Sequence, residues 1–222
     1  MLTPTNYTIS PDIYQEVLAQ LPKIDYRLGL NCQSGSFFHD PWCISPEFVG
    51  TVWETILDSL PEPKGEARLI RLEQGVAYPS HADIDDRWHL TITGNHSYLI
   101  DLEKEIMHQT NELGRWYSMD AGVRHTAANF GSEDRIQLVV RKLLPQPNIQ
   151  NPIGVKITLK TIVVDRRFIF DDVISPWLNR AYKKGIVDNF IGKDLVATFT
   201  VEQQYMEELK ILVKDHFDLT IL

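Results

Sequence analysis

Hydrophobic and polar residues alternate along several short stretches in the middle of the chain, a pattern typical of β-strands that bury one face. The clearest runs are Ala67–Leu72 and Trp88–Thr93. In the second run the tryptophan, leucine and isoleucine point one way, while His89 and the threonines point the other way, so a polar face can line a cavity. Further strands are expected at Ser97–Leu102, Gly114–Met119 and Arg135–Arg141. Many short strands separated by turn residues favour a sandwich or barrel.

Residues 1–65 have a helical pattern instead. Ser10-Pro11 and Ser45-Pro46 each resemble a helix N-cap followed by a proline in the first turn. The residues after Ser45 form a broad apolar stripe, which favours packing on the outside of a sheet. Between the two helices, Leu28–Trp42 is rich in glycine, serine and aromatic residues. This segment is a candidate substrate-contacting loop, although an ordinary connector has the same composition.

Proline, asparagine and glycine concentrate in residues 145–154, which indicates a linker. We therefore expect a first domain at 1–144 and a small α+β domain at 155–222. The expected elements of the second domain are strands at Val155–Val164, Leu195–Phe199 and Asp218–Leu222, a helix at Phe168–Lys184, and a last helix that begins with a capping box at Thr200–Gln203. Packing, covering of the substrate and homo-oligomerisation are all open roles for this region.

Composition narrows the class of protein. The net charge of −8 argues against general binding to nucleic acid or to an anionic membrane. The chain has no apolar run long enough to span a bilayer, and its first residues have no secretion-signal pattern, so we expect a cytoplasmic protein. Cys32 and Cys43 are the two cysteines. We expect them to be reduced, with a disulfide left open, and they have no partners at zinc-site spacing.

The candidate chemistry lies in His81-Ala82-Asp83, His125 and Arg135. Two histidines and one carboxylate form a ligand set that suits non-haem Fe(II) and leaves coordination positions open. Arg135 follows the second histidine by ten residues, which allows the chain to turn and return along a neighbouring strand. An arginine there offers a fixed, charged fork that can hold a carboxylate.

Other interpretations of these residues remain open. Asp85 or Asp86 is an alternative to Asp83 as the carboxylate ligand, and His39 is a reserve histidine. Arg135 could instead form an ion pair with a neighbouring acidic residue, either Glu133 or Asp134. Asn129 and Gly131 are explained as turn formers without any catalytic role.

The runs ARLIRLEQGVAYPSHADIDDRWHLTITG and GRWYSMDAGVRHTAANFGSEDRIQLVV resemble the double-stranded β-helix core of the aspartyl/asparaginyl β-hydroxylases and the related free-proline hydroxylases. The resemblance covers residues 66–143. Its most specific part is the H-x-x-x-N-x-G-x-x-x-R pattern that starts at His125 and ends at Arg135. It implies a mainly β fold with helices, built on a jelly-roll, cupin-like core with the N-terminal helices packed outside.

The same resemblance implies a dioxygenase that uses Fe(II), 2-oxoglutarate and O2. His81 and His125 would then bind iron, and Arg135 would hold the far carboxylate of 2-oxoglutarate. Arg87 and His89 match an R-x-H pattern whose family counterparts contact the co-substrate. Asp83 favours the full triad, although some aspartyl hydroxylases lack this carboxylate. The expected reaction is hydroxylation of a free amino acid or of a peptidyl side chain of the Asp, Asn or Pro type, which gives succinate and CO2. The alternative is a non-catalytic cupin-like module that binds a metal or a small ligand.

Overall fold

A computed structural model describes residues 1–222 except 62, 111, 161–169 and 194. The chain folds into two compact units. The first unit comprises Met1–Ser80 and Asp85–Leu143, and the second comprises Leu144–Leu222 together with the short segment His81–Ile84. Each unit is described by itself below.

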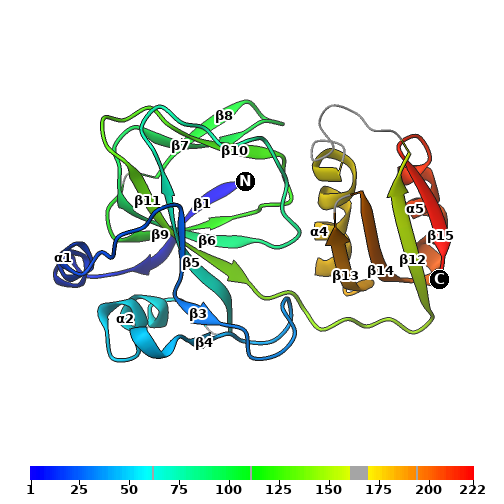
Figure 1. Ribbon diagram of the computed structural model, residues 1–222, viewed down its shortest axis with the longest axis horizontal. Coiled ribbons are helices and arrows are strands. Elements are labelled where there is room, and N and C mark those ends of the chain that lie inside the picture. The colour runs from blue at the N-terminus through cyan, green and yellow to red at the C-terminus, as the bar shows by residue number, and fades with distance from the viewer. Residues whose placement is uncertain (62, 111, 161–169, 194) are drawn as a thin grey trace. The chain divides into compact units, whose positions relative to one another are not determined.

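A six-stranded antiparallel sheet forms the centre of the first unit, in the order β1-β9-β6-β11-β5-β2 (Figure 1). Its strands are β1 (Leu2–Thr8), β2 (Arg27–Gly29), β5 (Lys64–Leu72), β6 (Arg87–Thr93), β9 (Arg115–Met119) and β11 (Arg135–Lys142). Strands β5, β6, β9 and β11 contain the strand predictions made above at 67–72, 88–93, 114–119 and 135–141, which are therefore confirmed to within a few residues.

A second sheet has the order β10-β7-β8 and faces the first (Figure 1). It comprises β7 (Ser97–Asp101), β8 (Ile106–Gln109) and β10 (His125–Asn129), and a bridge between Ala77 and Ala128 adds one more segment beside β10. An apolar cluster joins Leu72 and Met119 of the large sheet to Leu99 and Ala127 of the small one. The protein is mainly β with few helices, and this alternation of strands between two facing sheets is consistent with the predicted jelly roll.

The other face of the large sheet is covered by helices α1 (Pro11–Ala19) and α2 (Val52–Asp58), whose buried side chains pack with those of β5, β6 and β11. Ser10 caps α1 as predicted, because its hydroxyl accepts a hydrogen bond from the Ile13 amide at 3.3 Å. Ser45 does not start the second helix. A short 3-10 turn, η1 (Pro46–Phe48), intervenes, and Thr51 is the residue that caps α2.

Residues 1–65 are not purely helical, contrary to the sequence-based prediction. Strands β1 and β2 extend the two edges of the large sheet, and β3 (Asn31–Cys32) pairs with β4 (Cys43–Ile44). Most residues of β1 are exposed, so the strand has little of the apolar alternation that identifies strands in a sequence. Its pairing with β9 supplies the backbone hydrogen bonds that make it a strand.

Asn129 stabilises the turn that leads from β10 into β11. Its side-chain amide donates to the carbonyls of Leu72 and Glu133 at 3.1 and 2.9 Å, and its side-chain oxygen accepts from the Gly131 amide at 3.0 Å. A Cβ on Gly131 would lie 2.2 Å from the carbonyl oxygen of Asn95, so only glycine fits there. The asparagine and glycine of the H-x-x-x-N-x-G-x-x-x-R pattern are thus structural, and they determine where Arg135 enters its strand.

Replacing Asn129 by alanine is expected to lower the free energy of unfolding by roughly 2–4 kcal/mol, because three hydrogen bonds of a buried side chain are lost together. Urea titration followed by circular dichroism measures this change. Ser132→Ala, at an exposed side chain of the same turn, is the matched control and should change stability by less than about 0.5 kcal/mol. Equal stability of the two variants would contradict a structural role for Asn129.

The second unit is a small α+β domain. Its four-stranded sheet has the order β13-β14-β12-β15. The elements are β12 (Pro152–Leu159), the π-helical turn η2 (Phe170–Ile174), α4 (Ser175–Lys183), β13 (Val187–Lys193), β14 (Val196–Glu202), the 3-10 turn η3 (Gln203–Tyr205), α5 (Met206–Val213) and β15 (Phe217–Ile221). Strand β13 was not predicted, and residues 161–164 of the first predicted strand lie outside the described residues. Within the part of the chain that is described, no helix has the length and apolar character needed to cross a membrane.

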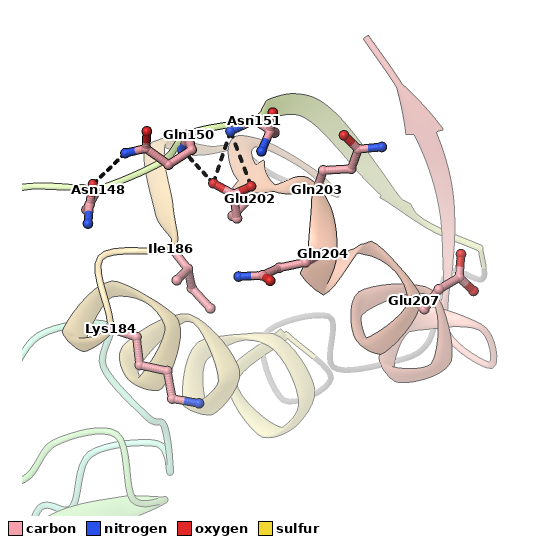
Figure 2. Close-up of a pocket in the computed structure, with 9 residues that line it drawn as sticks. All are labelled: Asn148, Gln150, Asn151, Lys184, Ile186, Glu202, Gln203, Gln204 and Glu207. Atoms are coloured by element: carbon pink, nitrogen blue, oxygen red, sulfur yellow. Dashed lines mark hydrogen bonds between the residues drawn. The ribbon is translucent and has the colours of Figure 1, made fainter.

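The predicted capping box at Thr200–Gln203 is wrong, because Thr200–Glu202 end strand β14 and α5 starts only at Met206. Glu202 has a different role. Its carboxylate accepts hydrogen bonds from the backbone amides of Gln150 and Asn151 (Figure 2), at 2.6 Å for Gln150. These bonds tie the segment before β12 to the end of β14, beside a polar pocket of about 790 Å³.

Candidate functional site

The structure brings together the three residues that the sequence singled out as metal ligands. Each of His81, Asp83 and His125 offers one ligand atom, and these atoms all lie within 4.8 Å of one another. His81 Nε2 is 3.8 Å from Asp83 Oδ2. Two imidazoles and a carboxylate in one small group have the donor chemistry that suits Fe(II).

His81 owes its position to the chain segment that precedes it. The Tyr78 amide donates to the Ala127 carbonyl at 2.9 Å, and the Thr126 hydroxyl donates to the Tyr78 carbonyl at 2.6 Å. The Arg124 side chain also donates to the Ser80 hydroxyl, at 3.0 Å. Residues 78–80 therefore run beside the start of β10, which brings His81 close to His125.

His125 is buried, and its ring is fixed by a local hydrogen bond. Nδ1 lies 2.7 Å from the carbonyl oxygen of Val123, which can only accept, so Nδ1 carries the proton. The neutral ring then has its lone pair on Nε2. A histidine that ligates a metal through one nitrogen commonly donates from the other nitrogen in this way, which fixes both the tautomer and the ring orientation. The geometry of His125 thus fits a metal ligand.

The alternative carboxylates have other partners. Asp85 is almost completely buried and forms ion pairs with Arg141 and Arg87. Asp86 accepts a hydrogen bond from the Ala121 amide at 3.3 Å. Among the described residues, the carboxylate that groups with the two histidines is Asp83, and His39 is outside the group.

Arg135 begins β11 and points to the inner face of the large sheet, with only 2% of its surface exposed. Its Nε has no hydrogen-bond partner among the described residues. The acidic neighbour Asp134 forms an ion pair with a different arginine, since its Oδ2 lies 2.7 Å from Arg71 Nε. Burial lowers the pKa of Arg135 to about 10, and the nearby Tyr78 phenol opposes this shift. The group therefore stays charged at neutral pH, as a buried cation with bonding capacity left for an anion.

His89 lies on the same inner face, in β6. Its Nδ1 is 2.9 Å from the side-chain oxygen of Gln137, whose amide nitrogen donates to two threonine hydroxyls. The pKa of His89 is lowered to about 3, mainly by burial; the hydrogen bond to Gln137 opposes this shift, and the charges of Arg135, Arg87 and His125 add to it. His89 is therefore neutral, and its Nε2 has no partner among the described residues. Arg87, the other co-substrate candidate, is buried two residues away and pairs with Asp85 at 3.8 Å.

A buried charged cluster on the same face was missed by the sequence analysis. Glu66 bonds to Arg68 and, at 2.9 Å, to Arg141 Nε, and Arg141 also bonds to Asp85. The ring of Phe37, from the predicted loop Leu28–Trp42, lies 5.1 Å from the guanidinium carbon of Arg141. One feature of the sequence could have indicated this cluster. Arg68 interrupts the otherwise apolar run Ala67–Ile70, and in a strand its side chain lies on the face opposite that of Leu69.

The fold is mainly β, with two facing sheets that are consistent with a jelly roll, and the ligand group gives it a candidate metal centre. Residues 44–145 match the family model described as aspartyl/asparaginyl beta-hydroxylase. The match includes every candidate residue from His81 to Arg135 and confirms the resemblance for this part of the chain. The family is one of hydroxylases, which supports an oxidoreductase.

Two solved structures resemble parts of the chain. A cupin domain from Bordetella pertussis Tohama I aligns with 37% of this chain and 84% of its own length, at 17% identity and a TM-score of 0.32. CapF, in a structure with the inhibitor 3-isopropenyl-tropolone, aligns with 60% of this chain and 42% of its own length, at 12% identity and a TM-score of 0.30. Both TM-scores are low, so the fold is taken from the strand order alone. No curated protein matches the chain.

Proposed function

We propose that the protein is an Fe(II)- and 2-oxoglutarate-dependent dioxygenase. It hydroxylates a free amino acid or a peptidyl side chain of the Asp, Asn or Pro type, with O2 as oxidant and succinate and CO2 as co-products. In this proposal His81, Asp83 and His125 hold the metal, Arg135 binds the co-substrate, and Arg87 and His89 contact it.

The proposal depends most on one observation, which is that Arg135 is a buried cation on the inner face of the large sheet, in the same compact unit as the ligand His125. A structural metal site needs ligands but has no use for a separate carboxylate-binding arginine. A buried guanidinium with an unsatisfied Nε is expensive unless an anion completes its bonding. The far carboxylate of 2-oxoglutarate is such an anion.

Each residue has a definable task in this reaction. His81, Asp83 and His125 would hold the metal, and a set of only three protein ligands would leave coordination positions for the co-substrate and for O2. Arg135 fixes the orientation of 2-oxoglutarate, because a planar fork can bind both carboxylate oxygens. Iron and 2-oxoglutarate, when bound, supply the oxidising power needed to hydroxylate a C–H bond. The facing apolar side chains of the two sheets exclude water from the interior.

The decisive experiment measures succinate. Protein stripped of metal and reloaded with Fe(II), in the presence of ascorbate and O2, should convert 2-oxoglutarate to succinate slowly even without a primary substrate. Protein reloaded with Zn(II) is the matched control, since zinc accepts the same ligands but has no redox chemistry. Succinate is quantified by NMR.

The binding of 2-oxoglutarate to the metal-loaded protein, measured by calorimetry, is the second readout. If the metal binds but 2-oxoglutarate does not, the hydroxylase proposal is wrong and a metal-binding module remains.

A further inference from the structure

Cys32 and Cys43 face each other in the short ladder of β3 and β4, and the function proposed above uses neither of them. They are direct partners in the antiparallel register. Both are free thiols on exposed residues, and Cys32 Sγ lies 3.5 Å from the Cys43 carbonyl oxygen. Because the sequence contains two cysteines, each can form an internal disulfide only with the other.

The register sets a distance between the two cysteines that suits a disulfide. The Ser45 amide donates to the Leu30 carbonyl at 3.0 Å, which makes these two residues a hydrogen-bonded pair. Such pairs recur at every second position of an antiparallel ladder, so Cys32 and Cys43 are expected to form one as well. The Cα atoms of a hydrogen-bonded pair are about 5.5 Å apart, inside the range of about 4.4–6.8 Å that disulfides span. The thiols can therefore be joined without unfolding the ladder.

The ladder is short, but it is attached to the large sheet. It has two residue pairs, and two strands alone are only marginally stable. The Asn31 side chain donates to the Gly65 carbonyl at 2.9 Å, and the Trp42 amide donates to the Lys64 carbonyl at 3.0 Å. The cysteines thus lie at an anchored base, from which residues 33–42 leave and to which they return.

Residues 33–42 form a loop with a defined contact inside the first unit. The rings of Phe37 and Trp42 meet edge to face, with centroids 5.3 Å apart, and the Trp42 indole nitrogen donates to the Phe37 carbonyl at 3.4 Å. The Phe37 ring also lies 5.1 Å from the guanidinium carbon of Arg141. A covalent link at the base of the loop would preserve this arrangement.

From this geometry we infer that Cys32 and Cys43 form a reversible disulfide, which joins β3 to β4 and thereby holds residues 33–42 on Arg141. Each thiol loses one hydrogen atom as the S–S bond forms, and a small-molecule disulfide such as oxidised glutathione is reduced to two thiols. The thiolate of one cysteine displaces the first glutathione, and the opposing thiolate displaces the second. Reduction reverses the reaction, because exposed disulfides are among those that thiols reduce readily.

The first test detects the disulfide itself. The full chain is incubated with excess oxidised glutathione, the remaining thiols are alkylated with iodoacetamide, and the intact mass is determined. We expect a monomer that is lighter than the reduced protein by two hydrogen atoms and that carries neither an alkyl group nor a glutathione. Treatment with dithiothreitol should restore both thiols to alkylation.

Cys32→Ser and Cys43→Ser are the matched variants, because each leaves one exposed thiol without a second one opposite it. After the same treatment each variant should retain one glutathione, since no thiol is present to displace it. Both positions are exposed, so serine is expected to change the stability by less than about 0.5 kcal/mol.

Hydrogen exchange then measures the effect of the disulfide on the loop. Amides in residues 31–44 should exchange about 10- to 100-fold more slowly in the oxidised protein, because the disulfide removes most conformations in which β3 and β4 are separated. Amides of β10 are the internal control and should exchange equally in both states. The serine variants should gain no such protection from glutathione treatment.

Three results would overturn the inference. One is wild-type protein that stays reduced, or that carries glutathione and no internal disulfide. Another is a disulfide-linked dimer in place of the oxidised monomer, which would make the cysteines an intermolecular contact. The third is an internal disulfide that leaves exchange in residues 31–44 unchanged, which would show that it does not hold the loop.

Discussion

His125→Ala is expected to lower metal affinity by at least about 100-fold and to stop conversion of 2-oxoglutarate to succinate. This factor is a lower bound, because loss of a group that merely supports a ligand already costs about 10- to 100-fold. His81→Ala should have the same effect. Metal content is measured by mass spectrometry after dialysis against a fixed free concentration of Fe(II), and succinate is quantified in parallel.

The two histidines differ in a way that separates ligation from folding. His125 is buried, with 4% of its surface exposed, whereas a third of the His81 side chain is exposed. His81→Ala should therefore lose metal with little change in the stability of the metal-free protein. His216→Ala, at an exposed histidine in the second unit, is the control and should retain normal metal content. Normal metal content in His81→Ala would contradict the assigned ligand set.

Arg135→Lys is expected to raise the Kd for 2-oxoglutarate by about 10- to 100-fold while metal content stays near normal. Lysine keeps a positive charge but cannot present two parallel donors to a carboxylate, so one charge-assisted hydrogen bond is lost. The Kd is measured by calorimetry on Zn(II)-loaded protein, which cannot turn over.

The control for this variant is Arg71→Lys. Arg71 faces Ile136, the residue after Arg135, across the β5–β11 ladder, and it forms an ion pair with Asp134, which comes just before β11. This substitution should leave the affinity for 2-oxoglutarate unchanged. A parallel loss of metal and co-substrate in Arg135→Lys would instead indicate that Arg135 maintains the fold.

The central strands could be predicted from the sequence because alternate residues of each strand face the same surroundings. In β6 the apolar residues pack against the helices and His89 faces the interior, as the alternation indicated. The ten-residue spacing from His125 to Arg135 predicted a turn between two strands. Asn129 and Gly131 are turn-forming residues, and in the structure they do form this turn. Patterns of this kind are local, and burial on one side of a strand reinforces them.

Predictions failed where distant partners decide the conformation. Strand β1 has a mostly exposed sequence and exists because β9 pairs with it. Thr200–Glu202 has the sequence of a helix start, yet Val201 is fully buried, and pairing with β12 and β13 keeps the segment in a strand. A ladder on both sides outweighs a preference for capping, which is worth only about 1 kcal/mol.

By itself, the sequence determined which residue types are available for chemistry and roughly which strands hold them. Residues 66–143 contain His81 and His125, the neighbouring aspartates Asp83, Asp85 and Asp86, and several arginines. Only the tertiary structure decided that Asp83 groups with the histidines while Asp85 pairs with arginines, and that Arg68 is buried with bonding capacity left over. The physical reason is that charge pairing and desolvation depend on neighbours from other strands, which lie far away along the chain.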